Sequence, residues 1–304
     1  MRCKEIVLFV FALGMVLFVS CTKQRAPSKP TGPDYASPAT FYTQYQQKVQ
    51  TFQVDSPGTG FIVGKMGTRL TGDASIFMYP NGQNVVYPFT LQLIEVYTGK
   101  DMILSNLPSL GGGKILQTMG EISVNAFKGS QQLVLRPGKK YFMELDTNKS
   151  LLSGMSVFYG VSGGSITDWT VLIPDTLSAV INYPFFYAMN IARMGWVSCA
   201  QNFNPGGATT TIDFTSAGTN IQNIDVFLVF KDIHSVVQVY GLKSQVAIPV
   251  GTNLTVVAIS RDANSGNSMV YDSQAITVGA GQQVTLNMKN ISDVALLNAL
   301  SAYN

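Results

Sequence analysis

From residue 51 onward, apolar side chains recur at every second position, and this alternation constrains the fold more than any other feature of the chain. The segment FTLQLIEVY places Phe89, Leu91 and Leu93 on one face, and GEISVNAF repeats the pattern from residue 120. A period of two is that of a β-strand with one buried face. Turn signals such as Asn81-Gly82 and Pro137-Gly138 separate the segments. Because no long helical pattern interrupts them, the sequence predicts an antiparallel β-sandwich.

A second series of alternating segments follows Pro205-Gly206-Gly207 and fills most of the last hundred residues. Its turns recur about every 8–14 residues, which suits a smaller sandwich. The closing segment SDVALLNALSAY predicts an amphipathic helix with Ser292 as its N-cap. Val294, Leu297 and Leu300 would form its apolar stripe and cover an end of the sheet.

The predicted class is therefore all-β, with two antiparallel β-sandwich domains and a short C-terminal helix. We expect a leader at 1–20, a tether at 21–50, one sandwich at 51–195 and a second sandwich with the helix at 196–304. The tether is rich in proline and poor in apolar residues before residue 39. Residues 41–54 fit a short helix or an entry strand. Residues 100–114 are interpreted as a connection in which Gly111–Gly113 form a flexible loop.

The leader combines Arg2 and Lys4 with the apolar run Ile6–Val19, which is followed by Ser20 and Cys21. The run has the length of a secretory signal core and is short for a membrane span. The arrangement resembles a bacterial lipoprotein signal, which implies cleavage before Cys21 and acylation of that cysteine. Two or more acyl chains hold a protein firmly on a membrane. A plain secretory signal and an uncleaved anchor are the alternatives.

The chain has three cysteines, and loss of Cys3 with lipidation of Cys21 would leave Cys199 alone. A single thiol forms no internal disulfide, so we expect Cys199 to be a small buried side chain. Zinc sites of the usual kinds require several His or Cys ligands. Asp262 and Asn264 lie in a turn that lacks the remaining ligands of a calcium loop. We therefore expect neither a metal nor a cofactor.

Charged residues are sparse and evenly spread: 20 are basic and 17 acidic, and the net charge is +3. No block of one sign is present, which argues against nucleic acid as a partner because phosphate binding requires concentrated basic charge. Charged residues make up 12% of the chain, about half the usual share. A surface covered by uncharged polar residues suits a β-rich protein outside the cytoplasm.

The order of a Gly-Thr strand near residue 58, the Asn81-Gly82 turn, Asp101-Met102-Ile103 and Gly120-Glu121-Ile122 resembles a module of Bacteroidetes lipoproteins. That module is distantly similar to sandwich modules of ankyrins and netrin receptors. The segment RMGWVSCAQNF resembles the Gly-Trp-Ile-Asn-Cys-Asp segment that follows it, with Ser198 and Ala200 differing. The resemblance covers about residues 50–205, and the rest is weakly similar to transthyretin-like domains. It implies a β-sandwich envelope protein and supplies no catalytic residue.

Catalytic groups are few. His234 is the only histidine, and Asp232 precedes it by two residues, at what is predicted to be the start of a strand. A glycosidase would need two facing carboxylates roughly 5–9.5 Å apart. The candidates are Glu95, Glu121, Glu144 and Asp146, of which the last two share a strand face. A solvated strand face is the simpler interpretation, so an enzyme is not expected.

Aromatic residues are the strongest binding signal. If YPFFY is a strand, Tyr183, Phe185 and Tyr187 share one face, and with Trp169 they could stack on a glycan. Packing in the core is the alternative, since each ring buries a large area.

These observations favour a lipid-anchored, non-catalytic binding or assembly module of the cell envelope for a protein or a glycan. The alternatives are a carboxylate-dependent envelope hydrolase and a structural stalk without a ligand. We expect an outer-membrane lipoprotein. The lack of acidic residues in TKQRAPS after Cys21 favours the periplasmic side over the cell surface.

Overall fold

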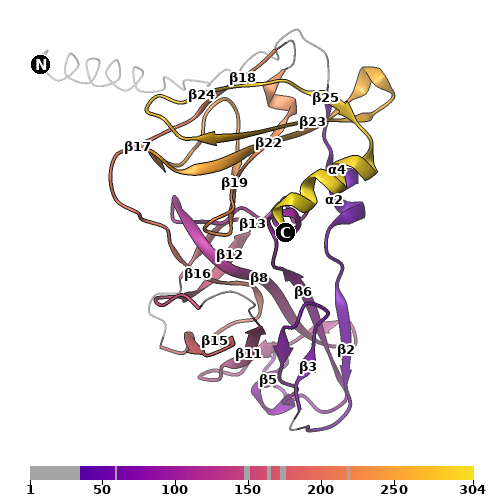
Figure 1. Ribbon diagram of the computed structural model, residues 1–304. Coiled ribbons are helices and arrows are strands. Elements are labelled where there is room, and N and C mark those ends of the chain that lie inside the picture. The colour runs from indigo at the N-terminus through magenta and orange to yellow at the C-terminus, as the bar shows by residue number, and fades with distance from the viewer. Residues whose placement is uncertain (1–34, 59, 147–150, 163–165, 172–175, 218–219) are drawn as a thin grey trace, which may run out of the picture. The chain divides into compact units, whose positions relative to one another are not determined.

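The computed structural model describes residues 35–58, 60–146, 151–162, 166–171, 176–217 and 220–304 (Figure 1). The predicted leader and Cys21 lie outside these residues. The described chain is mostly β, with antiparallel sheets and a short C-terminal helix. This confirms the all-β sandwich class that the alternation predicts.

Two sheets dominate the part of the chain before residue 203. One has the strand order β16-β12-β13-β7-β8-β6-β2, and the other has the order β14-β15-β11-β4-β3. The strands of the first are β2 (Gln50–Val54), β6 (Phe89–Val96), β7 (Leu110–Gly111), β8 (Lys114–Lys128), β12 (Ser156–Ser162), β13 (Ile166–Thr170) and β16 (Gly195–Asn202). Those of the second are β3 (Ile62–Val63), β4 (Arg69–Leu70), β11 (Tyr141–Asp146), β14 (Ala179–Tyr183) and β15 (Phe186–Ile191). Short strands β5 (Phe77–Met78), β9 (Gln131–Gln132) and β10 (Val134–Leu135) complete this part.

The predicted alternation builds the core of this first part. Phe89, Leu91 and Leu93 on β6 are buried on the face on which Val124 of β8 also packs. Tyr141, Met143 and Leu145 of β11, with alternate residues of β15, complete the same core from the other sheet. Each fully buried large apolar side chain contributes roughly 1.5–3 kcal/mol. The Asn81-Gly82 turn is present, with the Gly82 amide donating to the Tyr79 carbonyl at 2.8 Å.

The later part of the chain has a sheet of order β20-β19-β22-β23-β25, faced by shorter strand pairs β17–β21 and β18–β24. Their bounds are β17 (Thr209–Thr210), β18 (Asp213–Ser216), β19 (Asp225–Phe230), β20 (Ser235–Val239), β21 (Ile248–Pro249), β22 (Asn253–Asp262), β23 (Ser268–Thr277), β24 (Gln283–Leu286) and β25 (Lys289–Ile291). Phe214, Leu228 and Val256 are among the residues of its own core. The predicted second strand series is thus present.

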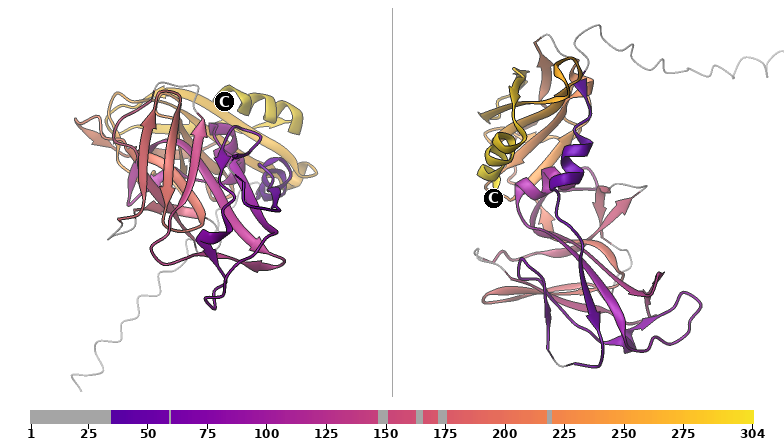
Figure 2. Two further views of the ribbon diagram at one scale, coloured as in Figure 1. Left: turned by 90° about the horizontal axis from the view of Figure 1, so that it is seen from below. Right: turned by 90° about the vertical axis from the view of Figure 1, so that its right-hand side faces the viewer.

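Helix α4 (Asp293–Leu300) closes the chain and lies against β23, as Figures 1 and 2 show. Ser292 caps it as predicted, accepting from the Ala295 amide at 3.2 Å. The predicted stripe is correct at Leu300, which is buried, and at the partly buried Leu297, but it is wrong at Val294, which is 68% exposed. The helix turns Leu296 inward in its place, beside Leu300. These two residues are four apart and so lie on one helix face.

The start of the described chain packs on the later sheet. β1 (Tyr35–Ala36) pairs with β22, and α2 (Ala39–Tyr45) buries Phe41 and Tyr42. The Tyr42 hydroxyl donates to the Asp225 carboxylate at 3.1 Å. The range predicted as a tether, 21–50, therefore overlaps ordered structure from Tyr35 on. Both alternatives for residues 41–54 occur, since α2 is followed by β2.

The segment predicted as a plain connection, residues 100–114, contains most of a helix that the prediction missed. In α3 (Gly99–Ser105), Thr98 caps the first turn by accepting from the Asp101 amide at 3.1 Å. Asn106 ends the helix in the left-handed conformation, with φ of 52°. Gly112 and Gly113 have positive φ and form the tight turn between β7 and β8 rather than a flexible loop.

A third hydrophobic cluster contains residues from before and after residue 203. α2, α3 and α4 contribute Phe41, Met102 and Leu296, and the sheets add Trp169 and Phe227. Ser109 is a polar link in the same region, because its amide donates to the Val236 carbonyl at 2.7 Å. In the part of the chain that the structure describes, no helix has both the length and the apolar character that crossing a membrane requires.

Candidate functional site

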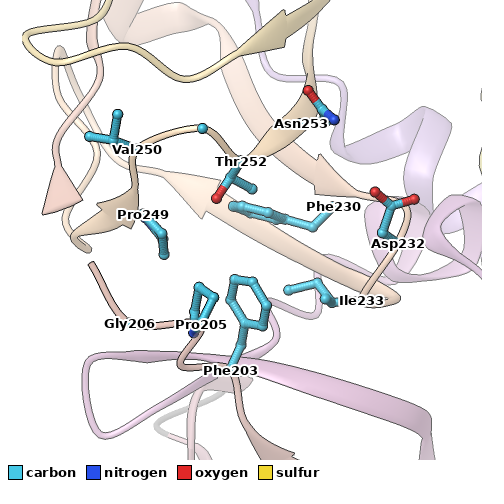
Figure 3. Close-up of a pocket in the computed structure, with 11 residues that line it drawn as sticks. Phe203, Pro205, Gly206, Phe230, Asp232, Ile233, Pro249, Val250, Thr252 and Asn253 are labelled. Atoms are coloured by element: carbon cyan, nitrogen blue, oxygen red, sulfur yellow. The ribbon is translucent and has the colours of Figure 1, made fainter. Parts of the chain in front are cut away.

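Three turns distant in sequence enclose a cavity of about 440 Å³, which we call the turn cavity (Figure 3). They are the segment after β16, the β19–β20 turn and the β21–β22 turn. The volume lies within the range of about 300–1,000 Å³ that is usual for ligand pockets. Its lining residues are Phe203, Pro205, Gly206, Phe230, Asp232, Ile233, Pro249, Val250, Gly251, Thr252 and Asn253.

Backbone hydrogen bonds hold the walls of the turn cavity. The Phe203 amide donates to the Ile115 carbonyl of β8 at 2.8 Å, and the Val250 amide donates to the Ala208 carbonyl at 2.9 Å. Gly251, with φ of 88°, permits the sharp β21–β22 turn. The cavity walls are therefore positioned by the two sheets and not by free loops.

The β19–β20 turn is fixed by His234. Its backbone has φ of 52°, and its Nδ1 lies 3.0 Å from the Thr118 carbonyl oxygen of β8. The prediction that His234 begins a strand beside Asp232 is wrong, because both residues lie in the turn before β20 begins at Ser235. The contact with Thr118 gives His234 a structural role, which is to hold the β19–β20 turn against β8.

The lining of the turn cavity is mainly apolar. Phe203, Pro205, Phe230 and Pro249 surround its centre in Figure 3, and the Thr252 hydroxyl points inward. Within the described residues, neither that hydroxyl nor the Asp232 carboxylate has a hydrogen-bond or ion-pair partner. An apolar pocket with a few unsatisfied polar groups is the usual composition of a binding site.

Asp232 also borders two neighbouring cavities of about 350 and 430 Å³, because it lies at the tip of the β19–β20 turn. Lys231 lines both of these cavities but not the turn cavity. Asp232 is the one charged residue among the described residues that line the turn cavity. This position gives the cavity a negative rim.

The predicted aromatic site is divided between the core and the surface. Trp169 and Tyr187 are 0% exposed, and the Trp169 indole N–H donates to the Pro108 carbonyl at 2.8 Å. These two residues thus pack in the core, where no ligand reaches them. Tyr183 and Phe185 are 43% and 77% exposed.

The segment YPFFY is a hairpin, not one strand. Tyr183 ends β14 and pairs with Phe186 at the start of β15, so Phe185 lies in the turn. The Tyr183 and Phe186 rings stack, with their centroids 4.7 Å apart. The result is an exposed aromatic tip on β14, the edge strand of its sheet among the described residues.

The carboxylates considered for catalysis do not form one site: Glu95 and Glu144 have structural partners, and Asp146 lies at the surface. Glu95 is buried and accepts from the amides of Met66 and Thr68, both at 3.0 Å. Glu144 forms an ion pair with Arg69 at 3.3 Å, and Asp146 is exposed. None of these three lines the turn cavity.

Glu121 is the most perturbed acid. It is fully buried, accepts from the Ser109 hydroxyl at 3.0 Å, and has no partner for Oε2 among the described residues. Burial raises the pKa of Glu121 to about 8, while the Ser109 hydrogen bond opposes this shift. The side chain is therefore largely protonated near neutral pH, inside the fold and away from the turn cavity.

The described residues contain no group of three or more His, Cys, Asp or Glu side chains placed to hold a metal ion. The Asp262 carboxylate instead accepts from the Asn264 amide at 2.9 Å and from the Ser265 hydroxyl at 2.6 Å. Cys199 is buried as predicted, and burial raises the pKa of its thiol to about 12. Such a thiol is unreactive at neutral pH.

The turn cavity itself was not predicted. The segments PGG and PVGTN each indicate a turn, but nothing in the sequence indicates that they meet. Comparison with known proteins adds no relative: no family model, no curated protein and no solved structure matches the chain.

Proposed function

We propose that this protein is a lipid-anchored, non-catalytic binding module of the bacterial cell envelope, and that the turn cavity holds an anchor side chain of a partner protein. The observation that carries the proposal is the cavity of about 440 Å³, with apolar walls, an inward hydroxyl and, at its edge, a carboxylate without a partner among the described residues. Interfaces commonly depend on one anchor residue that fills such a pocket.

A protein suits the cavity better than a glycan. Binding of a sugar ring by stacking requires an accessible aromatic face; Phe230 is only 1% exposed, so that the half-buried Phe203 is the one aromatic ring available among the described lining residues. The walls also include Pro249, which is buried, and Ile233 and Val250, which are aliphatic. An aliphatic lining stabilises an apolar stem by removing it from water.

The site is tested by blocking its rim. Val250 is 41% exposed and lines the turn cavity, so Val250→Arg places a long charged side chain there. We expect chemical cross-linking in the envelope fraction of the source bacterium to join the unaltered protein to its partner in one discrete adduct. The adduct should fall at least about tenfold in the variant, as for loss of an interface anchor.

Val294→Arg is the matched control, because Val294 is 68% exposed on α4 and does not line the turn cavity. It adds the same charge and should leave the adduct unchanged. An adduct that is equally strong with Val250→Arg would contradict the proposed site.

Anchoring is tested separately. We expect the unaltered protein to incorporate radiolabelled palmitate and to sediment with membranes, since acylated Cys21 would supply the attachment. Cys21→Ala should abolish the label and move most of the protein to the soluble fraction. Cys199→Ala is the control, because that thiol is buried, and it should retain the label. Equal labelling of the Cys21→Ala variant would refute lipidation at this position.

A further inference from the structure

The proposed function leaves open which kind of side chain the turn cavity holds. We propose that it binds a basic side chain, lysine or arginine, of the partner protein, with the apolar stem against the cavity walls and the charged end at Asp232. This inference rests on the proposed function and specifies its ligand class.

Charge complementarity selects a cation. Asp232 is the one charged group among the described lining residues, and its carboxylate has no partner in the described structure. An acidic anchor would be repelled by it. A purely aliphatic anchor would leave the carboxylate without compensation when the partner covers the rim and removes water.

The shape of the cavity matches the two-part chemistry of a basic side chain. Phe203 and Pro205 lie on one side of it and Pro249 and Phe230 on the others, while Asp232 lies at one end (Figure 3). Lysine and arginine bury an apolar stem and keep the charged end at a polar edge. The Phe203 ring can add attraction to a cation that lies over its face.

The Thr252 hydroxyl supplies the remaining polar contact. It points into the turn cavity and has no partner among the described residues, whereas the neighbouring Asn253 side chain is engaged by the Thr277 hydroxyl at 2.6 Å. A hydroxyl can accept a hydrogen bond from a guanidinium or ammonium group. The cavity thus presents two acceptors to a cation.

The test is isothermal titration of the full chain, in detergent, with two short peptides. One has the sequence Gly-Ser-Arg-Ser-Gly with blocked ends, and the other has citrulline in place of arginine, which removes the charge and keeps the shape. We expect millimolar binding of the arginine peptide, about tenfold tighter than that of the citrulline peptide. A tenfold ratio corresponds to about 1.4 kcal/mol, which the ion pair with Asp232 and the cation–π contact with Phe203 would supply in about equal parts.

Asp232→Asn should lower the ratio of the two dissociation constants from about ten to about three, because the cation–π contact with Phe203 remains. Asp55→Asn is the matched control, since it removes the same charge from an exposed residue that does not line the cavity, and it should preserve the ratio. Equal affinity for the two peptides, or no detectable binding of either, would overturn the inference. The cross-linking experiment with Val250→Arg judges the proposed function independently, so the two failures are distinguishable.

Discussion

Replacement of Trp169 with alanine is expected to lower the free energy of unfolding by about 3–5 kcal/mol. Trp169 is 0% exposed and lies in the hydrophobic cluster that α2, α3 and α4 share. Its indole N–H donates to the Pro108 carbonyl at 2.8 Å. Alanine would leave a large cavity and an unsatisfied carbonyl, and urea unfolding of both proteins measures the difference.

Two further variants make this result specific. Trp169→Phe retains most of the buried area but loses the hydrogen bond, so its effect should be smaller than that of alanine. Phe185→Ala removes a ring that is 77% exposed and should change stability by less than about 0.5 kcal/mol. A Trp169→Ala protein as stable as Phe185→Ala would show that the ring does not support the cluster.

The second large effect concerns Glu121, whose pKa burial raises from 4.5 to about 8. Between these two values the unfolded chain has lost the proton and the folded protein keeps it, so stability falls as pH rises. The total loss is about 5 kcal/mol, at about 1.36 kcal/mol for each pKa unit. Glu121→Gln cannot ionise, and it should remove this part of the pH dependence. Urea unfolding of both proteins at pH 5, 7 and 9 measures how steeply the free energy of unfolding of each depends on pH.

The comparison of slopes separates Glu121 from other titrating groups, such as Asp225, whose pKa burial also raises. Glutamine places an amide near an acceptor-poor site and can lower stability at pH 5 by about 1–3 kcal/mol. With each step up in pH, the free energy of unfolding of the variant should nevertheless rise relative to that of the unaltered protein. Parallel curves for the two proteins would mean that Glu121 does not keep its proton on folding.

The sequence predicts the fold class because one signal dominates it. Alternation places Phe89, Leu91 and Leu93 on one face, and all three are buried as expected. Burial of such faces decides strand placement wherever one side of a sheet is covered. The short helix α3 escaped prediction because its seven residues are too few for a clear period, although Thr98 and Asp101 carry a capping signal.

Local ambiguity explains the other errors. Pro184 in YPFFY favours a turn, and the structure has a hairpin there instead of the expected single strand. On α4, spacings of three and four are both compatible with an apolar face, and contact with β23 selects Leu296 and Leu300 over Val294. Neighbouring residues alone do not decide between these alternatives.

The turn cavity was beyond prediction for a different reason. Phe203, Phe230 and Val250 come from turns far apart in the chain, and their meeting depends on how the sheets pack. Sequence patterns report local periodicity and not the distance between two turns. In the sequence, Asp232 stands out only as a neighbour of His234, whereas in the structure it lies at the rim of a cavity.

The pairing of β1 with β22 determines how a mechanical force applied at the start of the described chain would pass through the molecule. The first described strand joins the folded body at Asp262 and Arg261, on the sheet built by the later residues. A force applied at Tyr35 would therefore be resisted first by two residue pairs and by the burial of Phe41 and Tyr42, before it reached β2. Separation of β1 from β22 would free the first residues of the described chain while the pairing of β22 with β19 and β23 stayed intact.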